Sequence, residues 1–381
     1  MKATKLYFPQ KYLLGPGVLE KGLKEAKNLG EKAVIITGKR WAIESGTLGR
    51  VEEILMSVGI KTHHVSGISP NPDAEEIDEK AEEVKKFDPD FVVGLGGGSV
   101  LDATKAISLV ARSGGHIWDY VERKRTPDDA FPIVAISTVA ASGSDFDGAA
   151  VINNRKLKAK MPISHPNLVP KISIIDVELH RTVPLYTTAI GCVDIFCQFY
   201  EPFIMGEQEF RSSGIIALSG MKLIVDLCPR VLESPENIDL RGELAYLASL
   251  SMSGIARAGR GGGFSMHWLE HVLSGHYPEI PHAQGLASLI VAYTKHFIDY
   301  HNVKLVSTYL TGKDDQLPDF LNRWLSQIGV NRKLRDLGVR KESLKEMARD
   351  VVHYYGWING KVPAPEPMDE TKVLKIYETS W

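Results

Sequence analysis

The chain has few cysteines, no long apolar run and almost no net charge. Three cysteines (Cys192, Cys197 and Cys228) are too few for a disulfide framework, which predicts buried thiols in a reducing, cytoplasmic setting. No stretch reaches the roughly 18 apolar residues of a membrane span, and residues 1–10 lack the apolar core of a secretion signal. A formal net charge of -2 gives no electrostatic reason to bind nucleic acid or an acidic membrane surface.

What is present is an ordered change of pattern along 381 residues, a length that predicts two domains. Short apolar runs alternate with helical patterns in the first part, which predicts a parallel sheet covered on both faces. The predicted strands are residues 33–37, 62–66, 90–94, 132–136 and 172–176, and the helices between them include 74–86, capped by Asp73, and 100–112.

The pattern becomes helical after Pro184. The predicted helices are residues 189–201, ended by Pro202, then 212–227, 240–258, 266–273 and 286–297. We therefore expect an α/β domain over residues 1–186 and an all-α domain over residues 187–381; the motifs described next indicate a dinucleotide-binding role for the first and a metal-binding role for the second.

A glycine-rich turn, Gly94 to Ser99, follows one predicted strand and opens a helix. Gly96, Gly97 and Gly98 lack Cβ atoms, so a diphosphate can approach the backbone, and the helix N-terminus attracts the anion. The turn fits neither the P-loop pattern nor G-x-G-x-x-G followed by an acidic residue. A tight turn that binds no ligand remains the alternative interpretation.

Two further features accompany this turn. Asp102 and Lys105 lie one turn apart on the following helix, where Asp102 could accept from substrate or cofactor hydroxyls and Lys105 is expected to be a solvated charge. A second run of small residues, 137–145, follows another strand. Because ligands bind at the carboxyl ends of strands in such sheets, both loops are expected at one binding edge.

Carboxylate, amide and imidazole groups recur at helical spacing in the second half. Asp194 and Gln198 are spaced i, i+4, with Glu201 continuing their face, and His267 and His271 are also spaced i, i+4. His276 and His282 are expected in a loop rich in glycine and proline. One carboxylate and two imidazoles suit a divalent metal and leave positions open for substrate. Structural histidines clustered by chance are the alternative.

Together these residues resemble the iron-containing alcohol dehydrogenase family along nearly the whole chain. Gly96 to Lys105 matches the family's GGGSxxDxxK cofactor loop, and Pro70-Asn71-Pro72 matches its characteristic turn. Residues 138–145 match more loosely, with Asp145 where glutamate is usual. Phe8-Pro9 and residues 15–17 resemble an opening hairpin. The similarity is greatest to butanol dehydrogenase-like, broad-range aldehyde reductases.

The resemblance implies a metal site and an activity. It implies metal binding by Asp194, His267 and His282, with Gln198 in place of the usual second ligand and Ala283 in place of a glycine. It implies Fe²⁺ or Zn²⁺ as a Lewis acid for hydride transfer between NAD(P)H and an aldehyde or primary alcohol.

The resemblance also implies contacts with the cofactor. The diphosphate would rest on Gly97, Gly98 and Ser99, Thr138 and Ser142 would line the nicotinamide path, and Lys160 would lie near the nicotinamide ribose. We interpret His271 as a candidate proton relay, with a packed helix histidine as the alternative. A homodimer joined near Leu6 to Phe8 is also implied.

The segment Gly38-Lys39-Arg40 bears on the choice of cofactor. The resemblance places it beside the adenosine ribose, where NAD-preferring relatives often carry aspartate. No carboxylate is present to repel a 2′-phosphate, and two cations can pair with it. The sequence therefore predicts NADP(H) over NAD(H), although both cations could simply be solvated.

Two other functions share this architecture. A dehydroquinate synthase-like or glycerol dehydrogenase-like enzyme would act on a sugar phosphate or polyol. A sugar phosphate would call for several basic side chains, and residues 260–281 offer only Arg260 besides histidines. A protein that binds nucleotide with reduced activity would explain Gln198 and Ala283. The identity of the aldehyde or alcohol does not follow from the sequence.

Overall fold

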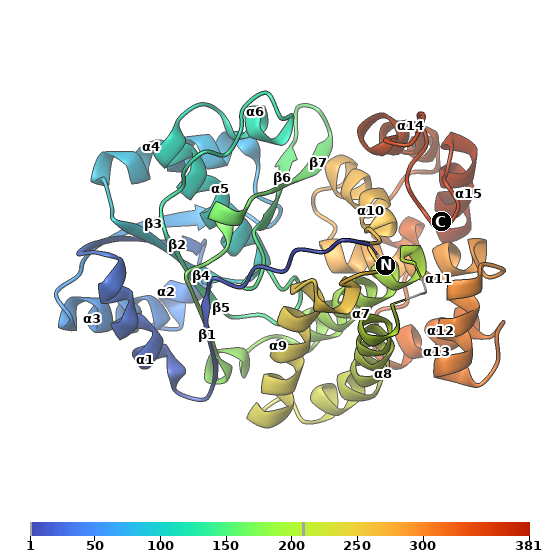
Figure 1. Ribbon diagram of the computed structural model, residues 1–381, viewed down its shortest axis with the longest axis horizontal. Coiled ribbons are helices and arrows are strands. Elements are labelled where there is room, and N and C mark those ends of the chain that lie inside the picture. Colours follow the sequence, from blue (N-terminus) through green and yellow to red (C-terminus); the bar gives the residue numbers. More distant parts are fainter. Residues whose placement is uncertain (1, 208–209) are drawn as a thin grey trace. The chain divides into compact units, whose positions relative to one another are not determined.

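The computed structural model describes residues 2–207 and 210–381, which form two compact units (Figure 1). The first, here called the sheet unit, comprises Tyr7–Val183 and Glu236–Met252. The second, the helical unit, comprises Pro184–Pro235, Ser253–Trp381 and the residues up to Leu6. The assignment of residues 1–186 and 187–381 to separate nucleotide-binding and metal-binding domains stays a prediction.

A six-stranded sheet forms the centre of the sheet unit, in the order β1-β8-β5-β4-β2-β3. All five strand pairs are parallel, as the alternation of strands and helices predicts. The strands are β1 (Lys11–Gly15), β2 (Lys32–Gly38), β3 (Lys61–Ile68), β4 (Phe91–Gly96), β5 (Ile133–Ser137) and β8 (Ile172–Asp176).

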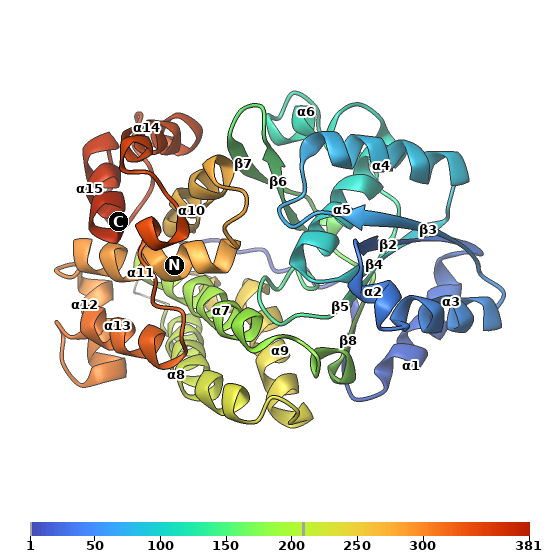
Figure 2. The same cartoon turned by 180° about the vertical axis from the view of Figure 1, so that it is seen from behind.

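Helices cover both faces of this sheet (Figures 1 and 2). Successive residues of a strand point to opposite faces, so each central strand contributes apolar side chains to a core on either side. In β2, Val34 and Ile36 belong to one core cluster, while Ala33 and Ile35 belong to the other. The helices of the unit are α1 (Val18–Glu25), α2 (Trp41–Glu44), α3 (Thr47–Ser57), α4 (Ala74–Phe87), α5 (Gly98–Ser113), α6 (Ile117–Val121) and α9 (Ile238–Met252). Asp73 caps α4, as predicted.

Three strands escaped prediction. β6 (Ala149–Asn154) and β7 (Ala159–Ser164) form a separate antiparallel hairpin. β1 is an edge strand that pairs in parallel with β8, so the expected opening hairpin around residues 8–17 is wrong. These strands lack the continuous apolar runs of the central ones, which is why periodicity did not reveal them.

The helical unit contains eight α-helices within the described residues. They are α7 (Leu185–Met205), α8 (Arg211–Glu233), α10 (Ser265–His276), α11 (His282–His296), α12 (His301–Thr311), α13 (Leu317–Gln327), α14 (Leu344–Tyr355) and α15 (Glu370–Ser380). α11 packs against both α7 and α10. Thus α7 lies against the pair α10 and α11, which comes much later in the chain.

Three sequence predictions about helices in the second half of the chain are wrong. Pro202 does not end α7, which continues through it to Met205. Arg260 and Asn302 donate to the carbonyl of Phe203 (3.2 and 3.3 Å), so side chains stabilise the last turn. His276 and His282 belong to helices rather than a loop. The helix predicted to reach residue 258 is α9, which ends at Met252.

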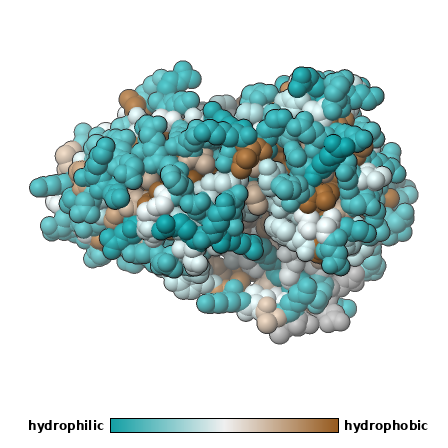
Figure 3. Space-filling model, turned by 90° about the horizontal axis from the view of Figure 1, so that it is seen from above, coloured by the Kyte–Doolittle hydropathy of each residue, from teal (hydrophilic) through white to brown (hydrophobic). Residues whose placement is uncertain are grey.

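The surface and the cysteines agree with the composition. The face in Figure 3 is mostly hydrophilic, with hydrophobic residues scattered over it. No helix within residues 2–207 and 210–381 combines the length and apolar character needed to cross a membrane. All three cysteines are buried and none forms a disulfide, as predicted. The cytoplasmic location stays a prediction.

Candidate active site

The two predicted loops of the sheet unit lie against each other. The backbone N–H of Thr138 donates to the carbonyl of Gly96 (3.1 Å). A Cβ atom added to Gly96 would lie 2.7 Å from the side chain of Val100, and one added to Gly98 would clash with Ser142. The glycines are therefore required by close packing as well as suited to ligand approach. The prediction that both loops share one edge of the sheet is confirmed.

Lys105 is fully buried, so its prediction as a solvated charge is wrong. Its ammonium donates to Ser144 Oγ (2.8 Å), Asp147 Oδ1 (2.9 Å) and the carbonyl of Ala149 (2.7 Å). The one-turn spacing between Asp102 and Lys105 gives no sign of these partners, which lie about forty residues further along the chain. The buried charge instead ties α5 to the segment that leads into β6.

Asp102 belongs to the same network. Its two carboxylate oxygens accept from Ser144 Oγ (2.6 Å) and from the backbone N–H of Val151 (3.0 Å). Burial raises the pKa of Asp102. The carboxylate thus fixes the second loop against α5, while its predicted roles in catalysis and cofactor binding stay predictions.

Asn71 joins two of the predicted cofactor residues. Lys160 Nζ donates to Asn71 Oδ1 (3.0 Å), and the backbone N–H of Asn71 donates to Ser99 Oγ (3.3 Å). Asn71 has a positive φ of 53°, which suits the turn between two prolines. The Pro70-Asn71-Pro72 motif alone gives no sign of the contact between the Asn71 side chain and Lys160, which lie far apart in the chain.

Gly38 ends β2, and Lys39 and Arg40 follow as exposed residues. Neither cation forms an ion pair with any residue of the described ranges. Both are therefore available to an anionic ligand at the carboxyl end of β2.

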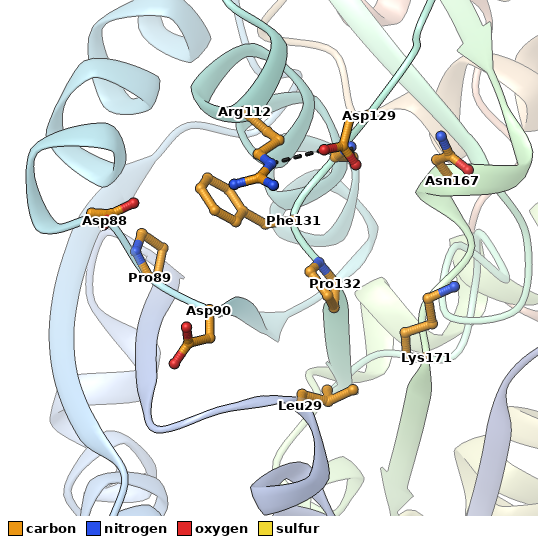
Figure 4. A pocket seen from close by; sticks show the side chains of 11 residues that line it. Leu29, Asp88, Pro89, Asp90, Arg112, Asp129, Phe131, Pro132, Asn167 and Lys171 are labelled. Carbon is orange, nitrogen blue, oxygen red and sulfur yellow. Dashed lines mark hydrogen bonds and ion pairs between the residues drawn. The ribbon is translucent and has the colours of Figure 1, made fainter.

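A cavity of about 630 Å³ lies in the sheet unit but away from these loops (Figure 4). Asp90, Pro132 and Lys171, which line it, precede β4, β5 and β8. Arg112 and Asp129 also line the cavity and form an ion pair (2.8 Å). None of the predicted site residues lines this cavity, which is at the amino ends of strands whose carboxyl ends carry the two loops.

Three predicted metal ligands converge in the helical unit. Asp194 is on α7, His267 on α10 and His282 at the start of α11, and one donor atom from each lies within 4.8 Å of the others. His267 Nε2 is 3.4 Å from Asp194 Oδ1. All three side chains are buried or half-buried. Because their donor atoms lie close together, the prediction from sequence that these residues form one group is confirmed.

Gln198 lies one turn after Asp194 and is buried. Its amide nitrogen donates to Asp194 Oδ1 (2.9 Å). Because a carboxylate accepts hydrogen bonds and donates none, the Gln198 side chain faces Asp194 with its amide nitrogen rather than its oxygen when no metal is bound. In this arrangement Gln198 orients the carboxylate; its predicted part as a metal ligand stays a prediction.

Two fully buried carboxylates hold the histidines from behind. Glu201 Oε1 lies 2.5 Å from His267 Nδ1, and Glu201 also accepts from the backbone N–H groups of Met266 and His267. Glu270 pairs with His282 Nδ1 and accepts from Ser274 Oγ. A carboxylate on Nδ1 leaves Nε2 for a metal and fixes the ring. Glu270 was missed, although its place before His271 was visible in the sequence.

The charges of this cluster favour a cation. Burial alone would lower the pKa of His267, but Glu201 and Asp194 outweigh burial and raise it from 6.5 to about 10. Buried carboxylates on both sides of one imidazole thus attract positive charge. The donor set of one carboxylate and two imidazoles, each supported by a carboxylate, fits Zn²⁺ or Fe²⁺.

His271 lies beside this cluster. Its ring centroid is 5.6 Å from that of His282 and 6.3 Å from that of His267. Its Nδ1 is 3.0 Å from the hydroxyl of Tyr355, the last residue of α14. Tyr355 was not among the predicted site residues, because nothing in the sequence links it to a histidine 84 positions away.

Comparisons with known proteins agree with these arrangements. The family description "Iron-containing alcohol dehydrogenase" matches residues 9–177, and "Fe-containing alcohol dehydrogenase family, C-terminal" matches residues 188–381. Together these matches span nearly the whole chain.

Individual relatives are similar over comparable lengths. The NADH-dependent butanol dehydrogenase B of Clostridium acetobutylicum is 28% identical over 94% of each chain, and the NADPH-dependent aldehyde reductase YqhD of Escherichia coli is 26% identical over 92% of each. The crystal structure of the NADH-dependent butanol dehydrogenase A of Thermotoga maritima has a TM-score of 0.94 and 29% identity, covering 100% of this chain and 99% of the other.

Proposed function

Because the chain belongs to the iron-containing alcohol dehydrogenase family, we propose that it reduces an aldehyde to a primary alcohol with NADPH, using one divalent cation. As a member of this family it is an enzyme that transfers hydride between NAD(P)H and an alcohol or aldehyde. The convergence of Asp194, His267 and His282, with carboxylates behind both imidazoles, carries the proposal.

The proposed metal ligands are Asp194, His267 and His282, with Gln198 as a fourth member through its amide oxygen. A bound Fe²⁺ or Zn²⁺ supplies a Lewis acid that polarises a carbonyl group. Glu201 and Glu270 orient the two imidazoles toward this ion. In the absence of the ion, the Gln198 amide nitrogen holds Asp194 in place.

The sheet unit is proposed to bind the cofactor, which supplies the hydride. Gly96, Gly97, Gly98 and Ser99 offer backbone N–H groups at the start of α5 to the diphosphate. Lys160, oriented by Asn71, is proposed to contact the nicotinamide ribose. The remaining proposed contacts are Thr138 and Ser142 along the nicotinamide and Asp102, which acts by holding the second loop.

Preference for NADP(H) over NAD(H) is the finer part of the proposal. Gly38, Lys39 and Arg40 place two unpaired cations and no carboxylate after β2. Most of the relatives whose names give a cofactor use NADH or NAD, and the aldehyde reductase YqhD uses NADPH, so the proposed preference rests on these two cations alone. We expect kcat/KM to be higher with NADPH, and the double substitution Lys39→Ala, Arg40→Ala to lower only the NADPH value. A higher efficiency with NADH in the unaltered enzyme would contradict this preference.

A homodimer is proposed from the first residues of the chain. Leu6, Tyr7 and Phe8 are 43–50% exposed, and β1, which follows them, is an edge strand. Consecutive exposed apolar residues beside an open strand edge suit pairing with a second copy. Sedimentation equilibrium would give twice the monomer mass for the native enzyme, and a monomer mass would contradict the proposal.

The experiment that tests the main proposal is NADPH oxidation with butanal, measured on chelator-treated protein before and after reloading with Fe²⁺ or Zn²⁺. We expect activity to be lost on chelation and to return with the preferred ion. Absence of activity with either ion, in protein that still binds NADPH, would overturn the proposed reaction.

A further inference from the structure

His271 is held by a hydroxyl group from another helix. The rings of His271 and Tyr355 are both buried, and the Tyr355 hydroxyl lies 3.0 Å from His271 Nδ1. Tyr355 ends α14, which packs against α10, the helix that also carries His267. The contact therefore connects the helix of a proposed metal ligand to a helix that contributes no ligand.

The ring of Tyr355 has little freedom to turn away. Trp268 stacks on it with centroids 5.6 Å apart and an interplanar angle of 10°. Trp357 packs edge-on against both rings, at 4.8 Å from Trp268 and 5.6 Å from Tyr355. These contacts fix the direction of the phenol C–O bond, so the hydroxyl stays at His271 Nδ1.

The chemistry of the two groups indicates which one donates. A phenol O–H is a stronger donor than a neutral imidazole N–H, and an unprotonated imidazole nitrogen is a stronger acceptor than a phenol oxygen. Burial, followed by the charge of Glu270, raises the pKa of Tyr355 well above 10, so the phenol keeps its proton. The favoured arrangement is therefore Tyr355 O–H donating to His271 Nδ1.

We propose that Tyr355 is a positioning residue that holds His271 as the tautomer with its proton on Nε2, making His271 a fixed hydrogen-bond donor to the substrate oxygen. This inference rests on the proposed aldehyde reduction. When hydride adds to the carbonyl carbon, the π electron pair moves to the oxygen, and the His271 Nε2–H stabilises the charge that develops there. His271 keeps this proton, and the proton that completes the alcohol comes from water. This assigns His271 a donor role in place of the relay that the sequence suggested.

The first test needs no turnover. Two-dimensional ¹H–¹⁵N NMR of ring nitrogens in zinc-loaded protein, with His271 assigned by comparison with His271→Gln, reports which nitrogen carries the proton. We expect the Nε2–H tautomer for His271. Observation of the Nδ1–H tautomer would overturn the proposal, whatever the activity of the enzyme.

The second test separates positioning from general stability. Tyr355→Phe keeps the ring and its stacking, and we expect it to lower kcat about tenfold, with KM and metal content unchanged. In a His271→Ala background, which itself lowers kcat about a hundredfold, the same substitution should have no further effect on kcat. Equal losses of kcat in both backgrounds would show that Tyr355 does not act through His271.

Tyr354→Phe is the matched control, because it removes a tyrosine hydroxyl group one position earlier on α14. Its kcat should remain that of the native enzyme.

Failure of the inference is distinguishable from failure of the proposed function. An enzyme that never oxidises NADPH with an aldehyde refutes the function, while the NMR result still decides the tautomer of His271.

Discussion

Two buried histidines, one in each unit, have opposite pKa shifts. His180 in the sheet unit donates through Nε2 to the carbonyl of Ser137 (3.0 Å), and burial lowers its pKa from 6.5 to about 4. His267 in the helical unit is as deeply buried, but Glu201 and Asp194 raise its pKa to about 10. Burial favours the neutral imidazole in both places, and only the neighbouring carboxylates reverse the sign.

The difference agrees with the ligand proposed for each unit. In the sheet unit, buried charges such as Lys105 and Asp102 are already matched by groups of the protein. In the helical unit, Glu201 and Asp194 face one imidazole and attract a positive charge. The first unit offers backbone N–H groups to an anion, and the second offers carboxylates and imidazoles to a cation.

The largest effect is expected from removing one of the proposed metal ligands of the helical unit. His267→Ala should abolish tight metal binding and lower kcat/KM for aldehyde reduction about a thousandfold, since a Lewis acid supplies several kcal/mol of charge stabilisation. Metal per chain, measured by elemental analysis after dialysis, checks this. His301→Ala, at an exposed position, is the control. Full metal content in His267→Ala would contradict the site.

Removal of the buried cation of the sheet unit should have the next largest effect. Lys105→Met leaves Asp102 and Asp147 without their positive partner, which we expect to lower the free energy of unfolding by about 3–5 kcal/mol. Urea unfolding of the metal-free protein measures the change. Lys86→Met, on the exposed face of α4, should change it little. Similar midpoints for the two variants would show that Lys105 is not a structural ion.

The lowered pKa of His180 predicts an acid sensitivity of the sheet unit. Between pH 6.5 and 4 the unfolded chain binds a proton at this residue and the folded chain does not, so stability falls as the pH falls. The loss is about 3 kcal/mol at 1.36 kcal/mol per pKa unit. His180→Gln should lose less stability than the native protein between pH 7 and 4, measured by urea unfolding at each pH. The exposed His116→Gln should behave like the native protein, and no difference for His180→Gln would refute the lowered pKa.

The smallest expected effect comes from the carboxylates behind the metal ligands. Glu270→Gln keeps a hydrogen bond to His282 but removes the charge, so metal affinity should fall about 10–100-fold. Competition with a chelator of known affinity measures this. The exposed Glu279→Gln, nine residues further along the chain, should leave the affinity unchanged. An unchanged affinity in Glu270→Gln would remove this carboxylate from the description of the site.

The parts of the fold that sequence predicted well are those with a strong local pattern. The apolar, β-branched run around Val34 and the capped acidic helix after Asp73 lie within one or two residues of the predicted positions. β1, β6 and β7 carry a weaker pattern and were missed. Pro202 misled the prediction of α7 because a proline in a last turn removes only one backbone donor, and Arg260 and Asn302 then satisfy the carbonyl of Phe203 at the helix end.

The candidate site divides in a similar way. Asp194, His267 and His282 were predicted because their spacing and their resemblance to a family are both written in the sequence. Tyr355 and the partners of Lys105 depend on contacts between residues far apart in the chain, which no local spacing encodes. Glu270 could have been predicted, since a histidine ligand needs a hydrogen-bond acceptor behind it.

The three proposed metal ligands lie on helices α7, α10 and α11, so a bound ion would close one long loop of chain, from Asp194 to His267, and one short loop, from His267 to His282, at a single point. Such a chelate acts as a reversible cross-link, and unfolding must release the ion. The unfolding midpoint of the helical unit is then set by mass action and rises with the concentration of free metal. Metal supply would therefore set the stability of the helical unit as well as the activity of the enzyme.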